Sequence, residues 1–358
     1  DMRSKSLRHG YTTGACAAAA ARGAALMLSE QRPLEEVELV LPAGESARFR
    51  LHGRRFDETS AACFVVKDAG DDPDVTHGCE VHAAVSLVPV RRPGEGGEPV
   101  VIEGGAGIGK VTKPGLAVPP GEWAINPVPR RMIAGAVAEV LGPRRARVTI
   151  SIPDGVERAK RTLNERLGIV GGLSILGTTG IVRPISTVAW IDTIDAALDV
   201  ARACGCETVV LSTGRTSEMV AQKELAALPE EAFIMMGDHV GHALRACARK
   251  GVPRVVLAGQ FAKLLKIACG HEQTHVSSSE LDLRTLDEWT RLSPQSSVLS
   301  PLVASANTAR ELLETSGNEP GLMALVCGRA KAFAGMLARE AEVQVLLAGY
   351  DGRVLYFA

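Results

Sequence analysis

The sequence has few aromatic side chains and almost no net charge, and both shortages exclude classes of function. Aromatic residues make up 4% of the 358 residues, too few for the stacking surfaces that bind single-stranded nucleic acid. The formal net charge is -1, so the chain as a whole does not attract nucleic acid or an anionic membrane. We therefore expect neither as a partner, and an anionic ligand has to be bound by local groups.

The sequence also lacks paired-cysteine motifs and an apolar segment long enough to cross a bilayer. Its 8 cysteines show no C-x-x-C spacing, which favours free thiols in a reducing cytoplasm. Residues 15–28, ACAAAAARGAALML, resemble a secretory signal, but the segment is rich in alanine and Arg22 interrupts it. We expect a closely packed helix capped by Thr12 or Thr13 instead.

The first half of the chain mixes strands and helices without regular alternation. This irregular pattern of strands and helices predicts a mixed α+β domain over residues 1–153. The helices expected in it are 15–28 and 126–142, and the strands include 37–42, 47–53, 60–70 and 147–153.

From residue 154 onward the pattern changes to apolar runs that alternate with amphipathic segments. After a helix expected over 154–168, the segments 208–220, 232–244 and 254–266 each read as a strand, a glycine-containing turn and a helix, and 343–350 reads as a late strand. Continuous apolar strands indicate a parallel sheet covered on both faces. We predict a doubly wound, Rossmann-like domain over 154–358, with ligands beyond the carboxyl ends of its strands.

Residues 270–275, GHEQTH, contain the H-E-x-x-H motif of zinc metalloproteases. That motif binds zinc only when both histidines leave one face of a helix. Here Gly270 is suited to end the preceding helix, and the following residues VSSS are poor helix formers. We expect a polar loop rather than a metal site.

Several turns at expected strand ends carry polar groups. The strand LSIL runs into Gly177, Thr178, Thr179 and Gly180, whose backbone can approach a ligand closely, although a plain tight turn explains the glycines equally. The turn is neither G-x-G-x-x-G nor a P-loop. Further candidates, each also explained by helix capping, are Thr213 and Gly214 in TGRT and Gly237 and Asp238 in GDHVG.

Charged residues gather in two kinds of loop. In KDAGDDPDVTHG (67–78), Asp68 and His77 are candidate proton acceptors, while cation binding or a solvated turn remain alternatives. Basic residues stand in glycine- and proline-rich loops, where they suit a polyanionic small molecule or serve only solubility. The basic candidates are Lys113, Arg130, Arg131 and Arg183.

An ordered set of motifs resembles one family. The segments are GYTTGACAAAAA (10–21), KDAGDDPDVTHG (67–78), GKVTKPGL (109–116), INPVPRRMI (125–133), NERLGIVGGLSILGTTGIVRP (164–184), GDHVG (237–241) and ANTA (306–309). Together they resemble the CbiD family, the cobalt-precorrin-5B C(1)-methyltransferases of anaerobic cobalamin biosynthesis. The chain departs from the family's usual G-H-x-G-K turn at residues 259–263, GQFAK.

The resemblance implies S-adenosylmethionine as methyl donor and a cobalt-containing tetrapyrrole as acceptor, with the only metal carried by the acceptor. We expect the donor at Gly177–Gly180, Thr213, Gly214, Gly237 and Asp238. The basic candidates would bind the acceptor, and His77 or Asp68 would act as the base.

Two other functions remain open. One is a zinc hydrolase that uses His271, Glu272 and His275. The other is a non-catalytic tetrapyrrole carrier with the same basic loops and no donor pocket. The sequence also leaves open a homo-oligomer.

Overall fold

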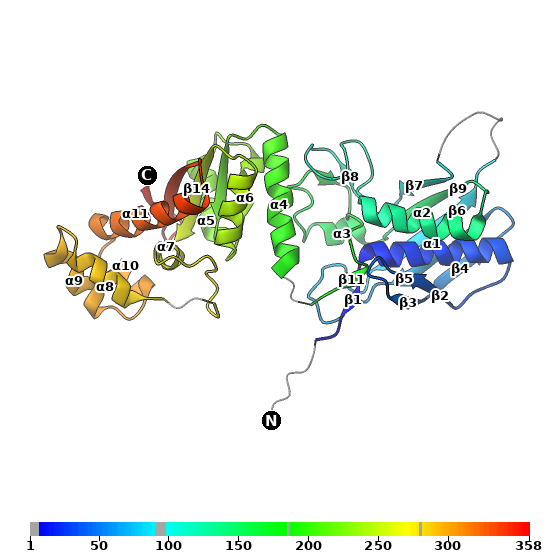
Figure 1. Ribbon diagram of the computed structural model, residues 1–358, viewed down its shortest axis with the longest axis horizontal. Coiled ribbons are helices and arrows are strands. Elements are labelled where there is room, and N and C mark those ends of the chain that lie inside the picture. The colour runs from blue at the N-terminus through cyan, green and yellow to red at the C-terminus, as the bar shows by residue number, and fades with distance from the viewer. Residues whose placement is uncertain (1–6, 90–97, 185–186, 279–280) are drawn as a thin grey trace, which may run out of the picture. The chain divides into compact units, whose positions relative to one another are not determined.

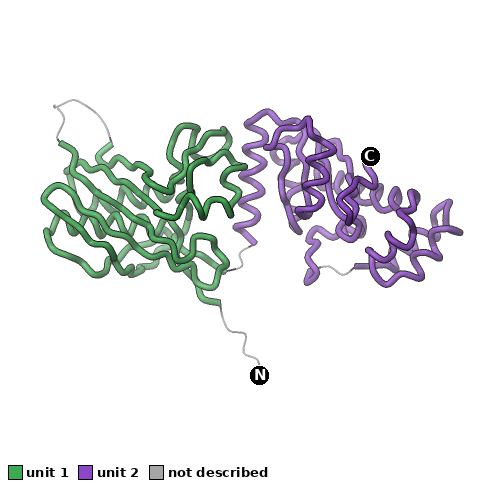
Figure 2. The backbone as a smooth tube through the Cα atoms, turned by 180° about the vertical axis from the view of Figure 1, so that it is seen from behind, with its two compact units in different colours: residues 1–186 green, residues 187–358 purple. Residues whose placement is uncertain are grey.

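The computed structural model describes residues 7–89, 98–184, 187–278 and 281–358. The chain divides into two compact units, residues 1–186 and residues 187–358 (Figure 2). Both units combine helices with β-sheets, so the predicted mixed α/β class is confirmed. Among the described residues, no helix combines the length and the hydropathy that crossing a bilayer would require.

The division lies later than the predicted one at 153/154 because the following segment pairs with earlier strands. β10 (Ile169–Val170) pairs with β8 (Lys110–Val111), and β11 (Ile181–Val182) pairs with β1 (Gly10–Tyr11). The glycine turn 177–180 therefore belongs to unit 1. It does not lie on the sheet of the second half, where we expected it.

Unit 1 is built on a sheet with the strand order β4-β5-β6-β9-β7. Its strands run antiparallel to their neighbours, except that β7 is parallel to β9. β2 and β3 form a separate hairpin. The bounds are β2 (Glu36–Val40), β3 (Ser46–Arg50), β4 (His52–Phe56), β5 (Ser60–Val66), β6 (Glu80–Leu87), β7 (Val100–Gly104) and β9 (Ala146–Ser151).

Two helices, α1 (Thr13–Glu30) and α2 (Pro127–Leu141), lie side by side on this sheet (Figure 1). The Thr12 side chain caps α1 by accepting a hydrogen bond from the Ala15 amide at 3.1 Å. The alanines of α1 are fully buried between the sheet and α2. Small side chains make this close packing possible, and the predicted helix is confirmed.

The helix expected over residues 154–168 is much shorter. α3 (Gly155–Ala159) is followed by turns. Ala159 packs against the core, but Val156 and Leu163 are 52% and 38% exposed, so the segment lacks the continuous apolar face that a longer helix would bury. Asn164 instead donates to the Gly172 carbonyl at 3.3 Å. The expected strand LSIL makes only isolated bridges.

Unit 2 contains a sheet with the strand order β13-β12-β14-β15-β16. The first four strands are parallel, and β16 is antiparallel to β15. β12 and β14 are buried over nearly their whole length, which explains their continuous apolar runs. The strand bounds are β12 (Thr208–Ser212), β13 (Phe233–Met235), β14 (Arg254–Gln260), β15 (Glu342–Ala348) and β16 (Val354–Phe357).

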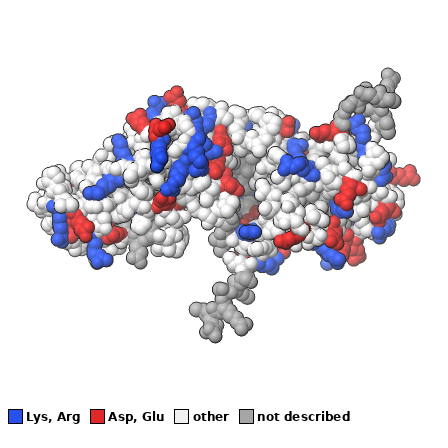
Figure 3. Space-filling view, in the orientation of Figure 1, with Lys and Arg blue, Asp and Glu red and all other residues white. Residues whose placement is uncertain are grey.

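Helices surround this sheet. α5 packs against β14 and β15, whereas α11 packs against α6, α7 and β15. The bounds are α4 (Thr187–Ala203), α5 (Arg215–Glu224), the 3-10 turn η1 (Glu230–Ala232), α6 (Val240–Arg249), α7 (Phe261–Ala268), α8 (Leu283–Arg291), α9 (Ser296–Ser305), α10 (Ala309–Thr315) and α11 (Pro320–Leu337). On the face drawn in Figure 3, basic and acidic side chains are interspersed in both units.

Candidate functional site

Segments from distant parts of the sequence meet at the amino end of α1 in unit 1. The Tyr11 amide donates to the Asp68 carbonyl at 2.8 Å, and the Gly14 amide donates to the Leu176 carbonyl at 2.8 Å. A Cβ on Gly177, which has φ +125°, would lie 2.4 Å from the Thr12 Cβ. Glycine is therefore required where the turn 177–180 crosses the helix cap.

A buried lysine fastens the acidic turn 67–78 to the same helix end. Lys67, with a side chain 3% exposed, donates to the Thr13 hydroxyl at 3.3 Å and to the Asp74 carboxylate at 2.5 Å. Burial raises the pKa of Asp74, but the Lys67 charge and hydrogen bonds from Lys67 and Thr76 outweigh it, so the pKa lies below its ordinary value. The Lys67–Asp74 pair therefore fixes the acidic turn against the start of α1.

Two arginines hold the rest of the acidic turn. Arg8 forms a bidentate ion pair with Asp68, and this hydrogen bonding lowers the pKa of the Asp68 carboxyl. Arg158 donates to the carbonyls of Val75 and His77 at 2.6 and 2.9 Å. Asp68 is therefore a weak base with both oxygens engaged.

The four predicted basic residues have different surroundings. Arg130 braces the loop before α2, since its Nε and Nη2 donate to the carbonyls of Ile125 and Trp123 at 2.9 and 3.2 Å. Lys113 donates to the Arg166 carbonyl at 3.4 Å. Arg131 and Arg183 are exposed. The exposed pair has the greater freedom to bind a ligand.

In unit 2, the predicted turns do meet at one sheet edge. Thr213 and Gly214 follow β12, while Gly237 and Asp238 follow the neighbouring parallel strand β13. At the end of β12, the Ser212 hydroxyl is buried without a hydrogen-bond partner among the described residues. Buried polar groups normally have a partner, so this edge has unused bonding capacity.

Asp238 is the centre of a polar network at this edge. Its Oδ1 accepts hydrogen bonds from Lys263 Nζ at 2.5 Å and from the Thr274 hydroxyl at 2.6 Å. Burial raises the pKa of Asp238, but these hydrogen bonds and the Lys263 charge outweigh it, so the pKa is lowered and the group stays ionised. Its Oδ2 has no hydrogen-bond partner in the described parts of the chain.

The H-E-x-x-H segment does not form a helix, and its backbone caps the first turn of α6. α7 ends at Ala268, as predicted, and Gly270 adopts φ +90°. The Glu272 carbonyl accepts from the Gly241 amide at 2.9 Å, and the Glu272 carboxylate pairs with Arg245. In the residues that the structure describes, no group of three His, Cys, Asp or Glu side chains is placed to hold a metal.

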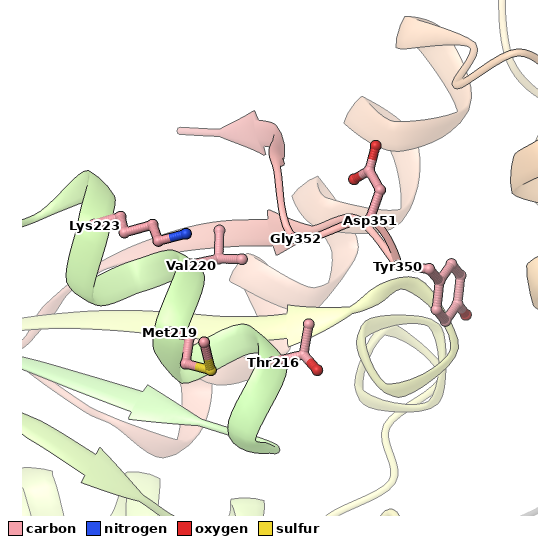
Figure 4. Close-up of a pocket in the computed structure, with 7 residues that line it drawn as sticks. All are labelled: Thr216, Met219, Val220, Lys223, Tyr350, Asp351 and Gly352. Carbon is pink, nitrogen blue, oxygen red and sulfur yellow. The ribbon is translucent and has the colours of Figure 1, made fainter.

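A hollow of about 240 Å³ lies between α5 and the turn before β16 (Figure 4). Its volume is below the roughly 300–1,000 Å³ of typical ligand pockets, so it could hold only part of a nucleotide-sized molecule. The Asp351 carboxylate is paired with Arg353 and points away from α5. The lining residues are Thr216, Met219, Val220, Lys223, Tyr350, Asp351 and Gly352.

Family models match both ends of the chain. The model described as CbiD matches residues 1–184, and the model described as CbiD, C-terminal domain, matches residues 273–358. The chain belongs to the CbiD family.

Curated CbiD relatives align over nearly the full length. The cobalt-precorrin-5B C(1)-methyltransferase of Geobacter sulfurreducens is 66% identical, over 99% of this chain and 100% of its own. The enzyme of that name from Priestia megaterium is 45% identical, over 86% of this chain and 83% of its own. A crystal structure of the cobalamin biosynthesis protein CbiD from Archaeoglobus fulgidus is 28% identical over 74% of this chain and 81% of its own, with a TM-score of 0.40. The predicted family is confirmed.

The sequence analysis assigned no role to several residues that hold together the acidic turn in unit 1 and the Asp238 network in unit 2. Lys67 is the first residue of the acidic turn, but nothing in the sequence indicates that it is buried. Lys263 and Thr274 are distant from Asp238 in sequence, and only the folded chain brings them together. The available signal was the position of Lys263 in the segment GQFAK, where the chain departs from the family's usual turn, and this departure does not predict a partner.

Proposed function

We propose that this CbiD protein transfers a methyl group from S-adenosylmethionine to C-1 of cobalt-precorrin-5B, giving cobalt-precorrin-6A in cobalamin biosynthesis. The observation that carries the proposal is the near full-length similarity to relatives named for this activity. One of them is 66% identical in sequence over 99% of this chain. Cobalt belongs to the substrate. We also propose a cytoplasmic location, and a homo-oligomer stays open.

The donor site that we propose is the strand edge of unit 2, with unit 2 acting as a Rossmann-like domain. The parallel order β13-β12-β14-β15 supports this, because ligands of such sheets bind beyond the carboxyl ends of the strands. Gly214 leaves open space beside the backbone, since a Cβ there would meet no atom within 4 Å, whereas the Trp190 ring covers Gly237. The ionised Asp238 offers Oδ2 to a ribose hydroxyl. Gly177–Gly180 are no longer included, because they belong to the other unit.

The acceptor site that we propose lies in unit 1, on the first turn of α2, which carries Arg130 and Arg131, and on the loops that carry Lys113 and Arg183. Arg131 and Arg183 are exposed and can form paired hydrogen bonds with acceptor carboxylates. Arg130 and Lys113 would contribute charge while bracing their loops. The donor supplies an already electrophilic methyl group. The task of the chain is therefore to align two ligands, which can lower a barrier by about 7–11 kcal/mol.

The two alternatives are less well supported. A zinc hydrolase would need Glu272 as a base beside the metal, but its carboxylate is paired with Arg245 and its carbonyl caps α6. A tetrapyrrole carrier would need no donor site, so donor binding distinguishes it from a methyltransferase.

Calorimetric titration of S-adenosylmethionine tests the proposal through Asp238→Asn. Asparagine keeps an oxygen acceptor for Thr274 but removes the charge that would bind the ribose hydroxyl. Loss of a hydrogen bond to a charged group costs about 1.5–3 kcal/mol, so we expect Kd to rise about tenfold to hundredfold.

Asp199→Asn is a matched control, since Asp199 also pairs with a lysine at 2.5 Å, but that lysine, Lys250, lies at the opposite end of α6 from Asp238. We expect the parent Kd in this control and unchanged melting temperatures in both variants. Parent-like donor affinity in Asp238→Asn would disprove the assigned donor site. No binding by the parent protein would favour the carrier.

A further inference from the structure

The imidazole of His77 is held by a backbone contact that fixes its hydrogen-bonding role. Its Nδ1 accepts a hydrogen bond from the Ala69 amide at 3.1 Å. Arg158 anchors the same residue from the other side by donating to its carbonyl at 2.9 Å. The side chain is 52% exposed, and its Nε2 has no partner among the described residues. The ring is therefore oriented on one side and open on the other.

The contact with Ala69 determines where the proton of the neutral ring lies. A ring nitrogen that accepts a hydrogen bond has to use its lone pair, so the proton is on Nε2. Neutral His77 thus presents an N–H to its open side. To accept a proton it would have to take it on Nδ1, which would set N–H against N–H over 3.1 Å.

The surrounding charges do not compensate for that conflict. The nearest carboxylate oxygen, Asp68 Oδ1, is 4.0 Å from Nδ1, which is beyond hydrogen-bond distance. Asp68 is also neutralised by its bidentate pair with Arg8.

We infer that His77 donates a hydrogen bond from Nε2 to an oxygen of the acceptor, and that it is not the base we first expected. This inference rests on the proposed function for the identity of the acceptor, a tetrapyrrole whose periphery carries oxygen-bearing substituents. A single fixed N–H positions one such oxygen relative to the amino end of α1. His77 therefore acts on acceptor affinity and orientation.

Two substitutions separate the donor role from the base role. His77→Gln keeps an N–H donor near the position of Nε2, whereas His77→Asn keeps an acceptor for the Ala69 amide but lacks the outer donor. In methyl-transfer assays we expect His77→Asn to raise the KM for the tetrapyrrole by about tenfold, the usual effect of one lost hydrogen bond, and His77→Gln to recover most of it. The kcat should change less than KM in both.

His52→Asn is the control, because His52 lies on β4 of the same unit and stacks on Phe64. It should leave KM at the parent value. A general base contributes about 100-fold to 10,000-fold to the rate, so a fall of kcat in that range in both His77 variants, with KM unchanged, would overturn the inference.

Nuclear magnetic resonance of the ¹⁵N-histidine-labelled protein tests the tautomer without any assay of activity. We expect His77, identified by the signal missing from His77→Gln, to show protonated Nε2 and unprotonated Nδ1 at pH 7. A ring protonated on Nδ1 would contradict the inference. If the parent does not methylate the tetrapyrrole but the Nε2–H tautomer is present, the proposed function and the acceptor-binding role fail while the geometric argument holds.

Discussion

At the scale of single residues, a buried ion pair decides how the acidic turn sits on α1. Lys67 is removed from water and Asp74 largely so, and their attraction only offsets the cost of burying them. Such pairs contribute little net stability compared with apolar residues, but removing one partner leaves an uncompensated charge. The Lys67–Asp74 pair therefore serves to position the acidic turn, because Lys67 joins the turn that carries His77 to Thr13 at the start of α1.

Lys67→Met should destabilise the protein strongly at neutral pH. We expect urea unfolding to report a loss of about 3–5 kcal/mol, the usual effect of breaking a buried pair. The folded pKa of Asp74 is below its unfolded value of about 3.9, so its stabilising contribution is present above that pH and is lost as the pH falls through the folded pKa. Because a protonated Asp74 has no charge to compensate, the difference between parent and variant should narrow below about pH 4.

The double variant Lys67→Met with Asp74→Asn provides the control for that measurement. It removes both charges, so it should recover part of the lost stability at pH 7. A single variant as stable as the parent at pH 7 would show that the pair is not buried as described.

At the scale of elements, the segment GHEQTH acts as a cap for another helix. Its backbone satisfies the Gly241 amide at the start of α6, and its Glu272 side chain pairs with Arg245 one turn further along the same helix. Unsatisfied amides at helix starts require such partners. The resemblance to a zinc motif is therefore a consequence of residue types that suit a polar cap.

The purified protein should contain no stoichiometric zinc, because His271 and His275 do not leave one face of a helix. Elemental analysis after dialysis checks this directly. His271→Ala and His275→Ala should retain the donor affinity of the parent. One zinc per chain, lost in either variant, would contradict this account of the segment.

The elements that sequence alone predicted well are those with a buried periodic face. α1 and α2 were expected within two residues at each end, and the strand and helix alternation of unit 2 was recovered at β12, β13 and β14. The helix predicted over 154–168 was wrong beyond Ala159, because the composition favours a helix while the exposed Val156 and Leu163 give it no continuous buried face. Partners distant in sequence, such as Lys263 for Asp238, leave no periodic signal at all. For this reason the sequence marked Asp238 as a residue at a strand end but did not indicate its partners Lys263 and Thr274.

At the scale of the whole molecule, the chain divides its candidate residues between two units. The match to the family model described as CbiD ends at residue 184, close to the observed division between the units at 186/187. This agreement supports unit 1 as a separate folding unit. Residues assigned to the acceptor are in unit 1, and those assigned to the donor are in unit 2. This division predicts that the two affinities can be changed independently.

The double variant Arg131→Ala with Arg183→Ala should weaken tetrapyrrole binding and leave S-adenosylmethionine binding unchanged. Each lost charge-assisted contact should cost about 1.5–3 kcal/mol, so we expect an acceptor affinity at least about 100-fold lower in equilibrium titration. Both arginines are exposed, and the melting temperature should therefore change little. A parallel loss of donor affinity would show that the residues are not separated in function.

The fully buried alanine helix has a consequence for how the candidate site moves. A helix whose side chains contact neighbours on almost every side exchanges its amide hydrogens only when the surrounding core opens. The turn that carries His77 and the glycine turn at 177–180 are both bonded to the first residues of that helix. A large flat molecule arriving there would therefore meet a surface already in its final shape, and recognition would depend on fit more than on rearrangement.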